Sequence, residues 1–147
     1  MDKLLIVDGN SIANRAFYAL PFLSNHNGQP SGAVFGFANI LIKIIGELSP
    51  THLVIAFDHA RKTFRNEIYP EYKMQRKSTP EELISQFPLI KQMLSAMNIK
   101  TIEESGIEAD DIIGSISKSC DCTKIILSGD RDLLQLIDDN TSVWLTK

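Results

Sequence analysis

Two acidic clusters, Glu108-Ala-Asp-Asp-Ile-Ile-Gly114 and Ser128-Gly-Asp-Arg-Asp-Leu133, stand on either side of a short apolar run. Together they hold five carboxylates. Each cluster abuts an apolar segment of the kind that a folded domain buries, so the acids are expected where packed elements end. The arrangement predicts that this stretch decides both the fold and the chemistry of the chain.

Short apolar segments alternate with helical patterns along the whole sequence. Apolar runs at residues 3–7, 52–57 and 124–127 predict buried strands, and shorter strands are expected at 100–103 and 142–145. Helical spacing and cap signals predict helices at 11–20, 33–48, 80–97 and 109–119, and a short helix at 132–137. Alternating strands and helices form a parallel sheet covered on both faces. We therefore expect an α/β fold in a single domain, residues 1–147.

The composition fits one compact domain. Of the 147 residues, 44% are hydrophobic and 22% are charged, and no apolar run approaches the roughly 20 residues of a membrane helix. The run at residues 4–7 is too short for a signal peptide, so we expect a soluble, cytoplasmic monomer without membrane contacts. Cys120 and Cys122 are too close in sequence for a useful structural disulfide, and we expect two free thiols.

Seven carboxylates are expected at one edge of the sheet. Three follow predicted strands directly, at the edge where α/β sheets bind ligands. Three more start the predicted helix at 109–119, and the last lies two residues beyond the third strand-end acid. The seven predicted metal ligands are Asp8, Asp58, Glu108, Asp110, Asp111, Asp130 and Asp132.

Bound cations are the expected reason for this crowding. Any one of these acids could serve only as a helix cap or as a first-turn acid that complements the helix dipole. Seven like charges at one edge would repel one another and raise one another's pKa values. Oxygen ligands without Cys or His favour a hard ion, Mg²⁺ or Mn²⁺.

A basic segment lies close to these acids in the sequence. Residues 61–77 carry six basic and two acidic side chains in a protein of net charge −3. The segment alone could be a solvated helix, but beside a metal centre it could bind the phosphates of a nucleic acid. Lys62 and Arg65 would share one face of a helix and could neutralise charge on a scissile phosphate. Two carboxylate-held ions suit phosphodiester hydrolysis.

Other chemistry fits the sequence less well. There is neither a P-loop nor a dinucleotide-binding glycine motif, and Ser11 and Ser128 have no evident His partner. Asn10 stands where a haloacid-dehalogenase-like phosphatase would have its second Asp, which argues against that reaction.

Six motif blocks in order resemble the N-terminal 5′-nuclease domain of bacterial DNA polymerase I, a family that belongs with the flap endonucleases and has a PIN-like α/β fold. The blocks are Leu5-Ile-Val-Asp-Gly-Asn-Ser11 with Arg15-Ala-Phe-Tyr-Ala-Leu-Pro21, Ala56-Phe-Asp58, Lys62-Thr-Phe-Arg65, Tyr72-Lys73 with Arg76, and the two acidic clusters.

The resemblance implies a two-metal 5′ to 3′ exonuclease and flap endonuclease that uses Mg²⁺ or Mn²⁺. Its substrates would be branched or nicked DNA with a 5′ single-stranded flap, and RNA primers, in DNA replication and repair. It implies a first metal held by Asp8, Asp58, Glu108 and Asp110, and a second held by Asp110, Asp111, Asp130 and Asp132. Lys62, Arg65 and Asp110 would be catalytic, and the DNA-binding residues would be Arg15, Lys62, Arg65, Tyr72, Lys73, Arg76 and Lys77.

The chain departs from that family's pattern in two places. Asn14 stands where the family usually has an aromatic residue. The family also continues past the position of Lys147 into a helix-hairpin-helix region that is expected to complete the second metal site. Two alternatives therefore remain: a metal- and DNA-binding segment that cuts little by itself, and a PIN-like ribonuclease. Residues 62–78 would correspond to the family's helical arch.

Overall fold

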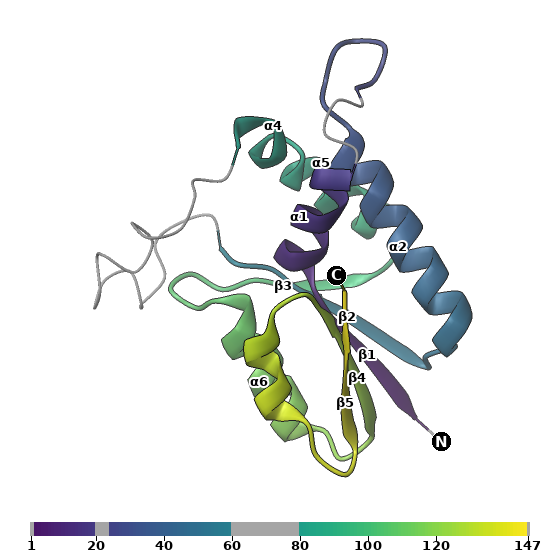
Figure 1. Ribbon diagram of the computed structural model, residues 1–147, viewed down its shortest axis with the longest axis vertical. Helices are drawn as coiled ribbons and strands as arrows, with labels where there is room; N and C mark the ends of the chain where they lie inside the picture. The colour runs from purple at the N-terminus through teal and green to yellow at the C-terminus, as the bar shows by residue number, and fades with distance from the viewer. Residues whose placement is uncertain (1, 20–23, 60–79, 147) are drawn as a thin grey trace.

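Five parallel strands form the centre of the computed structural model, which describes residues 2–19, 24–59 and 80–146 (Figure 1). The strands are β1 (Lys3–Asp8), β2 (His52–Ala56), β3 (Lys100–Ile102), β4 (Thr123–Ser128) and β5 (Thr141–Leu145). Their order in the sheet is β3-β2-β1-β4-β5. The predicted α/β fold with a parallel sheet is therefore confirmed.

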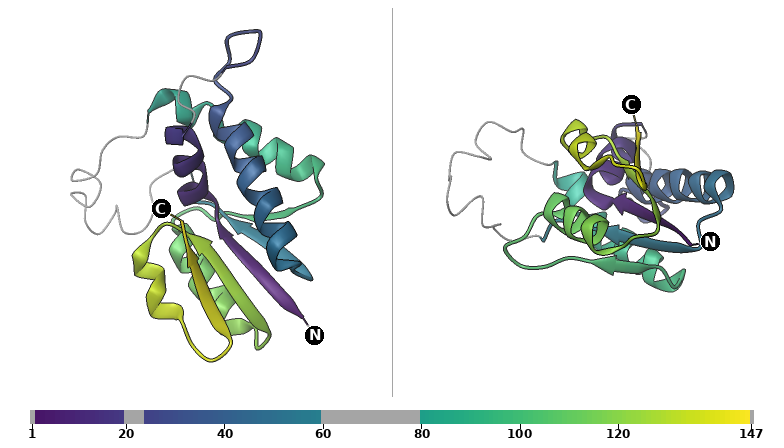
Figure 2. Two further views of the ribbon diagram at one scale, coloured as in Figure 1. Left: turned by 45° about the vertical axis from the view of Figure 1, so that its right-hand side comes forward. Right: turned by 90° about the horizontal axis from the view of Figure 1, so that it is seen from below.

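Helices lie on both faces of this sheet (Figure 2). They are α1 (Gly9–Ala19), α2 (Gly32–Leu48), α4 (Glu81–Ile84), α5 (Phe87–Ala96), α6 (Ala109–Ser119) and the 3₁₀ helix η2 (Arg131–Leu136). The helices α1 and α2 pack closely side by side, because a Cβ atom at Gly36 would lie only 2.7 Å from the Cβ of Ala16. Gly36 thus allows the two helix backbones to approach each other.

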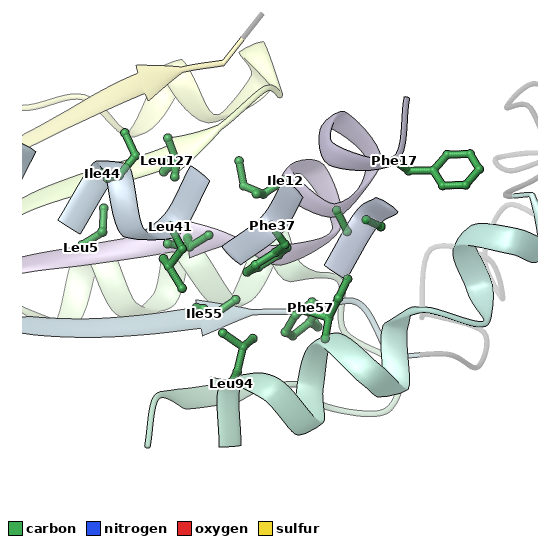
Figure 3. Close-up of a cluster of buried hydrophobic side chains, with 14 of the residues drawn as sticks. Leu5, Ile12, Phe17, Phe37, Leu41, Ile44, Ile55, Phe57, Leu94 and Leu127 are labelled. Atoms are coloured by element: carbon green, nitrogen blue, oxygen red, sulfur yellow. The ribbon is translucent and has the colours of Figure 1, made fainter. Parts of the chain in front are cut away.

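The alternation of side chains along the strands separates two hydrophobic cores. On one face, Leu5, Ile55 and Leu127 pack against α1, α2 and α5 (Figure 3). On the other face, Ile6 and Ile126 pack with buried residues of α6 and η2. The central strands are thus buried on both sides, as continuous apolar runs in parallel sheets usually are.

The order of the strands reverses direction near the middle of the sheet. The chain passes from β1 to β2 and β3 on one side, and then crosses to β4 and β5 on the other. Ligands bind α/β sheets at such a reversal, outside the carboxyl ends of the strands. Here the reversal lies between β1 and β4, which are paired neighbours.

The helix predicted at residues 80–97 is wrong as a single element, because the structure divides it into α4 and α5. Pro88 lies in the first turn of α5 and has no N–H with which to continue a helix from α4. Gln86, between the two helices, is buried, and its Oε1 accepts hydrogen bonds from the N–H groups of Ala33 (2.7 Å) and Val34 (3.2 Å). The break therefore lets a distant side chain cap the first turn of α2.

The expectation of two free thiols is also wrong, because Cys120 and Cys122 are joined by a disulfide. They lie at the connection from α6 into β4, where their Cα atoms are 5.5 Å apart, within the usual range for a bridged pair. Within the described ranges, no helix is long and apolar enough to span a bilayer.

Candidate functional site

Three predicted metal ligands lie at the carboxyl edge of the sheet, on either side of the strand-order reversal. Asp8 is the last residue of β1, Asp58 follows β2 by two residues, and Asp130 follows β4 by two residues. Asp8 is only 4% exposed. Since β1 lies between β2 and β4, Asp8 is the central member of this row.

The Asp8 carboxylate is buried and hydrogen-bonded from both sides. Its Oδ1 accepts from the backbone N–H of Ser11 at 3.3 Å, and its Oδ2 accepts from the hydroxyl of Ser128 at 2.7 Å. Burial raises the pKa of Asp8 to about 6; the two hydrogen bonds oppose that rise, and the negative charges of Asp58 and Asp130 add to it. Asp58 and Asp130 are therefore close enough to affect the ionisation of Asp8.

Helix α6 brings a second row of acids to the same place. Glu108 is at its N-cap position and only 6% exposed, while Asp110 and Asp111 lie in its first turn. The pKa of Asp110 rises to about 7, first through burial and then through the charges of Asp8 and Asp130, a hydrogen bond with Asp130, and the charge of Asp58. Four of the seven predicted ligands, Asp8, Asp58, Asp110 and Asp130, thus form one electrostatically coupled group.

Backbone amides hold the carboxylates at this edge. Asp58 Oδ1 accepts from the N–H of Ala109 at 2.7 Å, which ties the end of β2 to the start of α6. Asp130 caps η2, because its Oδ1 accepts from the N–H of Asp132 at 2.9 Å. The Asp132 residue itself is exposed. The metal-ligand roles of all seven acids stay predictions.

Three polar residues that support the acids were not identified as such from the sequence. Ser128 is fully buried, and its hydroxyl both donates to Asp8 and accepts from the N–H of Asp130 at 3.0 Å. Asn10 and Ser11 accept from the backbone N–H groups of Asp58 and Gly129, at 2.8 and 2.7 Å. All three lie within three residues of a strand-end carboxylate in the sequence, and this was the available signal.

The donor set suits a hard divalent cation. The coupled group offers only carboxylate oxygens, and its mutual repulsion would be relieved by positive charge. Within residues 2–19, 24–59 and 80–146, no three Asp, Glu, His or Cys side chains already enclose a position for a metal ion. Small movements of the side chains, several of which are now hydrogen-bonded to backbone amides, would be needed to bind one.

The predicted basic and aromatic residues of the site mostly fall outside the described ranges. These are Lys62, Arg65, Tyr72, Lys73, Arg76 and Lys77. Arg15 is described: it is exposed on α1 and lines a groove of about 490 Å³ between α1 and α2, together with Tyr18 and Asn39. The Asn14 side chain donates to the carbonyl of Asn10 at 2.8 Å, so it bonds within its own helix.

Solved structures share the overall fold of this chain. The bacteriophage T5 5′-exonuclease with bound divalent metal ions (zinc) has a TM-score of 0.72 and 25% identity, over 97% of this chain and 55% of that one. The T5 D15 protein co-crystallised with metal ions has a TM-score of 0.69 and 25% identity, over 97% of this chain and 54% of that one. The fold is thus that of the T5 5′-exonuclease.

The chain belongs to the family described as 5′-3′ exonuclease, N-terminal resolvase-like domain, whose sequence pattern matches residues 3–147. It is 47% identical to DNA polymerase I of Bacillus subtilis and 46% identical to that of Geobacillus stearothermophilus, over 99% of this chain in both cases. It spans only 17% of the length of each of those proteins. The resemblance to the N-terminal part of DNA polymerase I is confirmed.

Proposed function

We propose that this chain is the metal-binding part of a structure-specific 5′ nuclease, with 5′ to 3′ exonuclease and flap endonuclease activity. One observation carries the proposal: four carboxylates from two strand-end loops, the end of β1 and the start of α6 are electrostatically coupled at one edge of the sheet. Membership of the 5′-3′ exonuclease family supports the reaction class.

The carboxylates would hold two divalent ions, Mg²⁺ or Mn²⁺. Asp8, Asp58, Glu108 and Asp110 would bind the first, and Asp110, Asp111, Asp130 and Asp132 the second. Such ions activate a water molecule and stabilise a leaving oxygen in phosphodiester hydrolysis. The protein's own contribution is to hold several acids close together and partly shielded from solvent, where a bound cation would relieve their mutual repulsion.

The proposed substrates are branched or nicked DNA with a 5′ single-stranded flap, and RNA primers. Two further structures support a DNA ligand by likeness of fold: a T5 flap endonuclease complex with DNA and metal ions, and the catalytic core of Rad2 in complex with a DNA substrate. Lys62 and Arg65 would neutralise the scissile phosphate, and Arg15, Tyr72, Lys73, Arg76 and Lys77 would bind the DNA. Such cationic contacts make binding weaker as salt rises.

The test is cleavage of a labelled 5′-flap DNA with increasing Mg²⁺ or Mn²⁺, by the unaltered chain and by Asp110→Ala. Asp139→Ala, a change at an exposed acid beside β5, is the matched control. We expect Asp110→Ala to lose cleavage and the control to keep it. Undiminished cutting by Asp110→Ala would contradict the proposal.

Two further arms separate the alternatives. Cleavage of single-stranded RNA in preference to flap DNA would favour a PIN-like ribonuclease. Binding of Mn²⁺ and flap DNA without cleavage would favour a segment that needs the remainder of a longer nuclease, since the curated relatives are about six times as long as this chain.

A further inference from the structure

The first turn of α1 lies between the two strand-end loops that carry Asp58 and Asp130. Its residues Asn10 and Ser11 each bond to one of these loops. We propose that Asn10 and Ser11 are positioning residues that hold the loops at a fixed distance from Asp8, so that the carboxylates can share a cation. The inference rests on the proposed metal centre and assigns roles to two residues that would not touch the ion themselves.

Asn10 fixes the loop on the β2 side. Its Oδ1 accepts the backbone N–H of Asp58 at 2.8 Å, across 48 residues of sequence. The Asp58 carboxylate in turn accepts the N–H of Ala109 at 2.7 Å. Two successive hydrogen bonds therefore connect the start of α1 through Asp58 to the start of α6, which carries Asp110.

Ser11 fixes the loop on the β4 side. Its Oγ accepts the N–H of Gly129 at 2.7 Å, across 118 residues of sequence. The backbone N–H of Ser11 donates to Asp8 Oδ1 at 3.3 Å. Ser11 thus contacts the Asp8 carboxylate with its main chain and the residue before Asp130 with its side chain.

These contacts differ from ordinary helix capping. A capping side chain accepts from an N–H two or three residues further along its own helix. Asn10 and Ser11 instead accept from N–H groups of other loops, one on each side of β1. Their side-chain oxygens satisfy the backbone N–H of Asp58 and the N–H of Gly129, the residue before Asp130.

Close packing leaves little freedom for this turn to move. A Cβ atom built at Gly9 would lie 2.5 Å from a ring carbon of Phe57, so the turn packs directly on that ring. Phe57 is fully buried and precedes Asp58. The apolar contact sets the distance between the turn and the β2 loop, and the Asn10 hydrogen bond then fixes the backbone orientation of Asp58.

Loss of such supporting partners of metal ligands typically weakens metal binding by about 10- to 100-fold. A large effect is expected here, because the coupled carboxylates repel one another and would separate if their loops were free to move. We therefore expect either positioning residue to affect metal affinity more than it affects overall stability.

The experiment measures Mn²⁺ dissociation constants by electron paramagnetic resonance for Asn10→Ala, Ser11→Ala and Ser11→Thr. Amide hydrogen exchange by NMR follows the N–H groups of Asp58 and Gly129 in the same proteins. Asn39→Ala on α2 and Ser119→Ala on α6 are matched controls at exposed positions.

We expect Asn10→Ala to speed exchange of the Asp58 amide, Ser11→Ala to speed exchange of the Gly129 amide, and both to weaken Mn²⁺ binding by about 10- to 100-fold. Ser11→Thr keeps the hydroxyl and should restore affinity to within about threefold of the unaltered chain. The controls should change neither quantity. The two substitutions act on opposite sides of β1, so either one tests the proposal if the other protein does not fold.

Faster amide exchange with unchanged Mn²⁺ affinity would overturn the positioning role. A parallel titration of Asp8→Asn separates this failure from failure of the proposed function. If Asp8→Asn binds Mn²⁺ as tightly as the unaltered chain, the metal centre itself is refuted. If Asp8→Asn loses binding while Asn10→Ala and Ser11→Ala keep it, only the positioning role is refuted.

Discussion

Buried charge is arranged differently at the two edges of the sheet. At the amino edge, the Lys3 ammonium donates to the carbonyl of Leu48 at 2.8 Å, and the Lys124 ammonium donates to the carbonyl of Cys120. These carbonyls belong to the ends of α2 and α6, where helix dipoles attract cations. Each lysine is thus satisfied by a local acceptor.

At the carboxyl edge, the charges are instead alike and coupled to one another. Asp8 and Asp110 have raised pKa values, although backbone amides and a buried hydroxyl donate to the acids of this group. Burial and mutual repulsion outweigh these hydrogen bonds. At the amino edge each lysine has a partner within the chain. At the carboxyl edge the acids repel one another, and a bound cation would relieve that repulsion. Four experiments test that contrast.

The largest expected effect is on metal binding by Asp110→Asn. The change removes a charge from the coupled group, so Mn²⁺ affinity should fall by at least about 100-fold. The same change should raise the melting temperature of the metal-free protein, because it relieves repulsion with Asp8 and Asp130. Calorimetric titration and thermal melting measure the two effects. Asp139→Asn is the control, and a lowered melting temperature in Asp110→Asn would contradict the idea of stored repulsion.

At the amino edge, Lys124→Ala should lower the free energy of unfolding by about 2–3 kcal/mol, measured in urea. Lys124 is only 3% exposed, so its loss removes both a buried side chain and a charged donor to Cys120. Lys118→Ala, on the exposed face of α6, should change the value by no more than about 0.5 kcal/mol. If both substitutions lowered the free energy of unfolding equally, the contact of Lys124 with Cys120 would have no special role at the amino edge.

The pH dependence of stability follows from the carboxyl edge. In the folded protein, Asp8 and Asp110 have pKa values of about 6 and about 7, above their ordinary value of 3.8. The folded state therefore keeps protons that the unfolded chain has lost, and this stabilisation, complete below about pH 4, is lost as the pH rises through 6 and 7.

Between about pH 5.5 and pH 8, the free energy of unfolding of the metal-free protein should fall by about 1–2 kcal/mol, a figure reduced for solvent screening at the partly exposed Asp110. Denaturant unfolding at several pH values measures it. Asp110→Asn should make the dependence shallower, and stability that rises with pH over this range would count against coupled acids at this edge.

The smallest effect is expected at Glu103, an acid of the carboxyl edge that lies outside the coupled group. Its carboxylate pairs with Lys91 at 2.7 Å and with His59 at 3.1 Å. Burial raises its pKa, but the hydrogen bonds and charges of Lys91 and His59 outweigh burial and lower it on balance. Because the three side chains are about 30% exposed, Glu103→Gln should cost no more than about 0.5 kcal/mol in urea unfolding. A cost above 1.5 kcal/mol would show that satisfied pairs also matter at this edge.

Local patterns in the sequence were sufficient to predict the strands and the acids at their ends. Residues such as Leu5, Ile6 and Val7 form an uninterrupted apolar run because both faces of a central parallel strand are buried. Asp8 and Asp130 were placed at the carboxyl edge because each follows such a run. These features depend on residues that are adjacent in the sequence, so one sequence is enough to predict them.

Contacts between distant segments were not predictable in the same way. Gln86, in the break between α4 and α5, caps α2 through a contact with Ala33, 53 residues away, and no local pattern indicates that partner. Asn10 and Ser11 looked like ordinary helix-start residues, yet they bond to loops 48 and 118 residues further along. Side-chain partners of this kind follow from the order of the strands, which local periodicity does not specify.

The capping of α2 by Gln86 has a consequence for how the domain can change during evolution. Asp58 is held by Asn10 on one side of residues 60–79, and Gln86 is held by the start of α2 on the other. The chain is therefore fixed to the folded frame at two points, Asp58 and Gln86. Neither hydrogen bond involves residues 60–79, so the frame and the sequence between these two points can change separately during evolution.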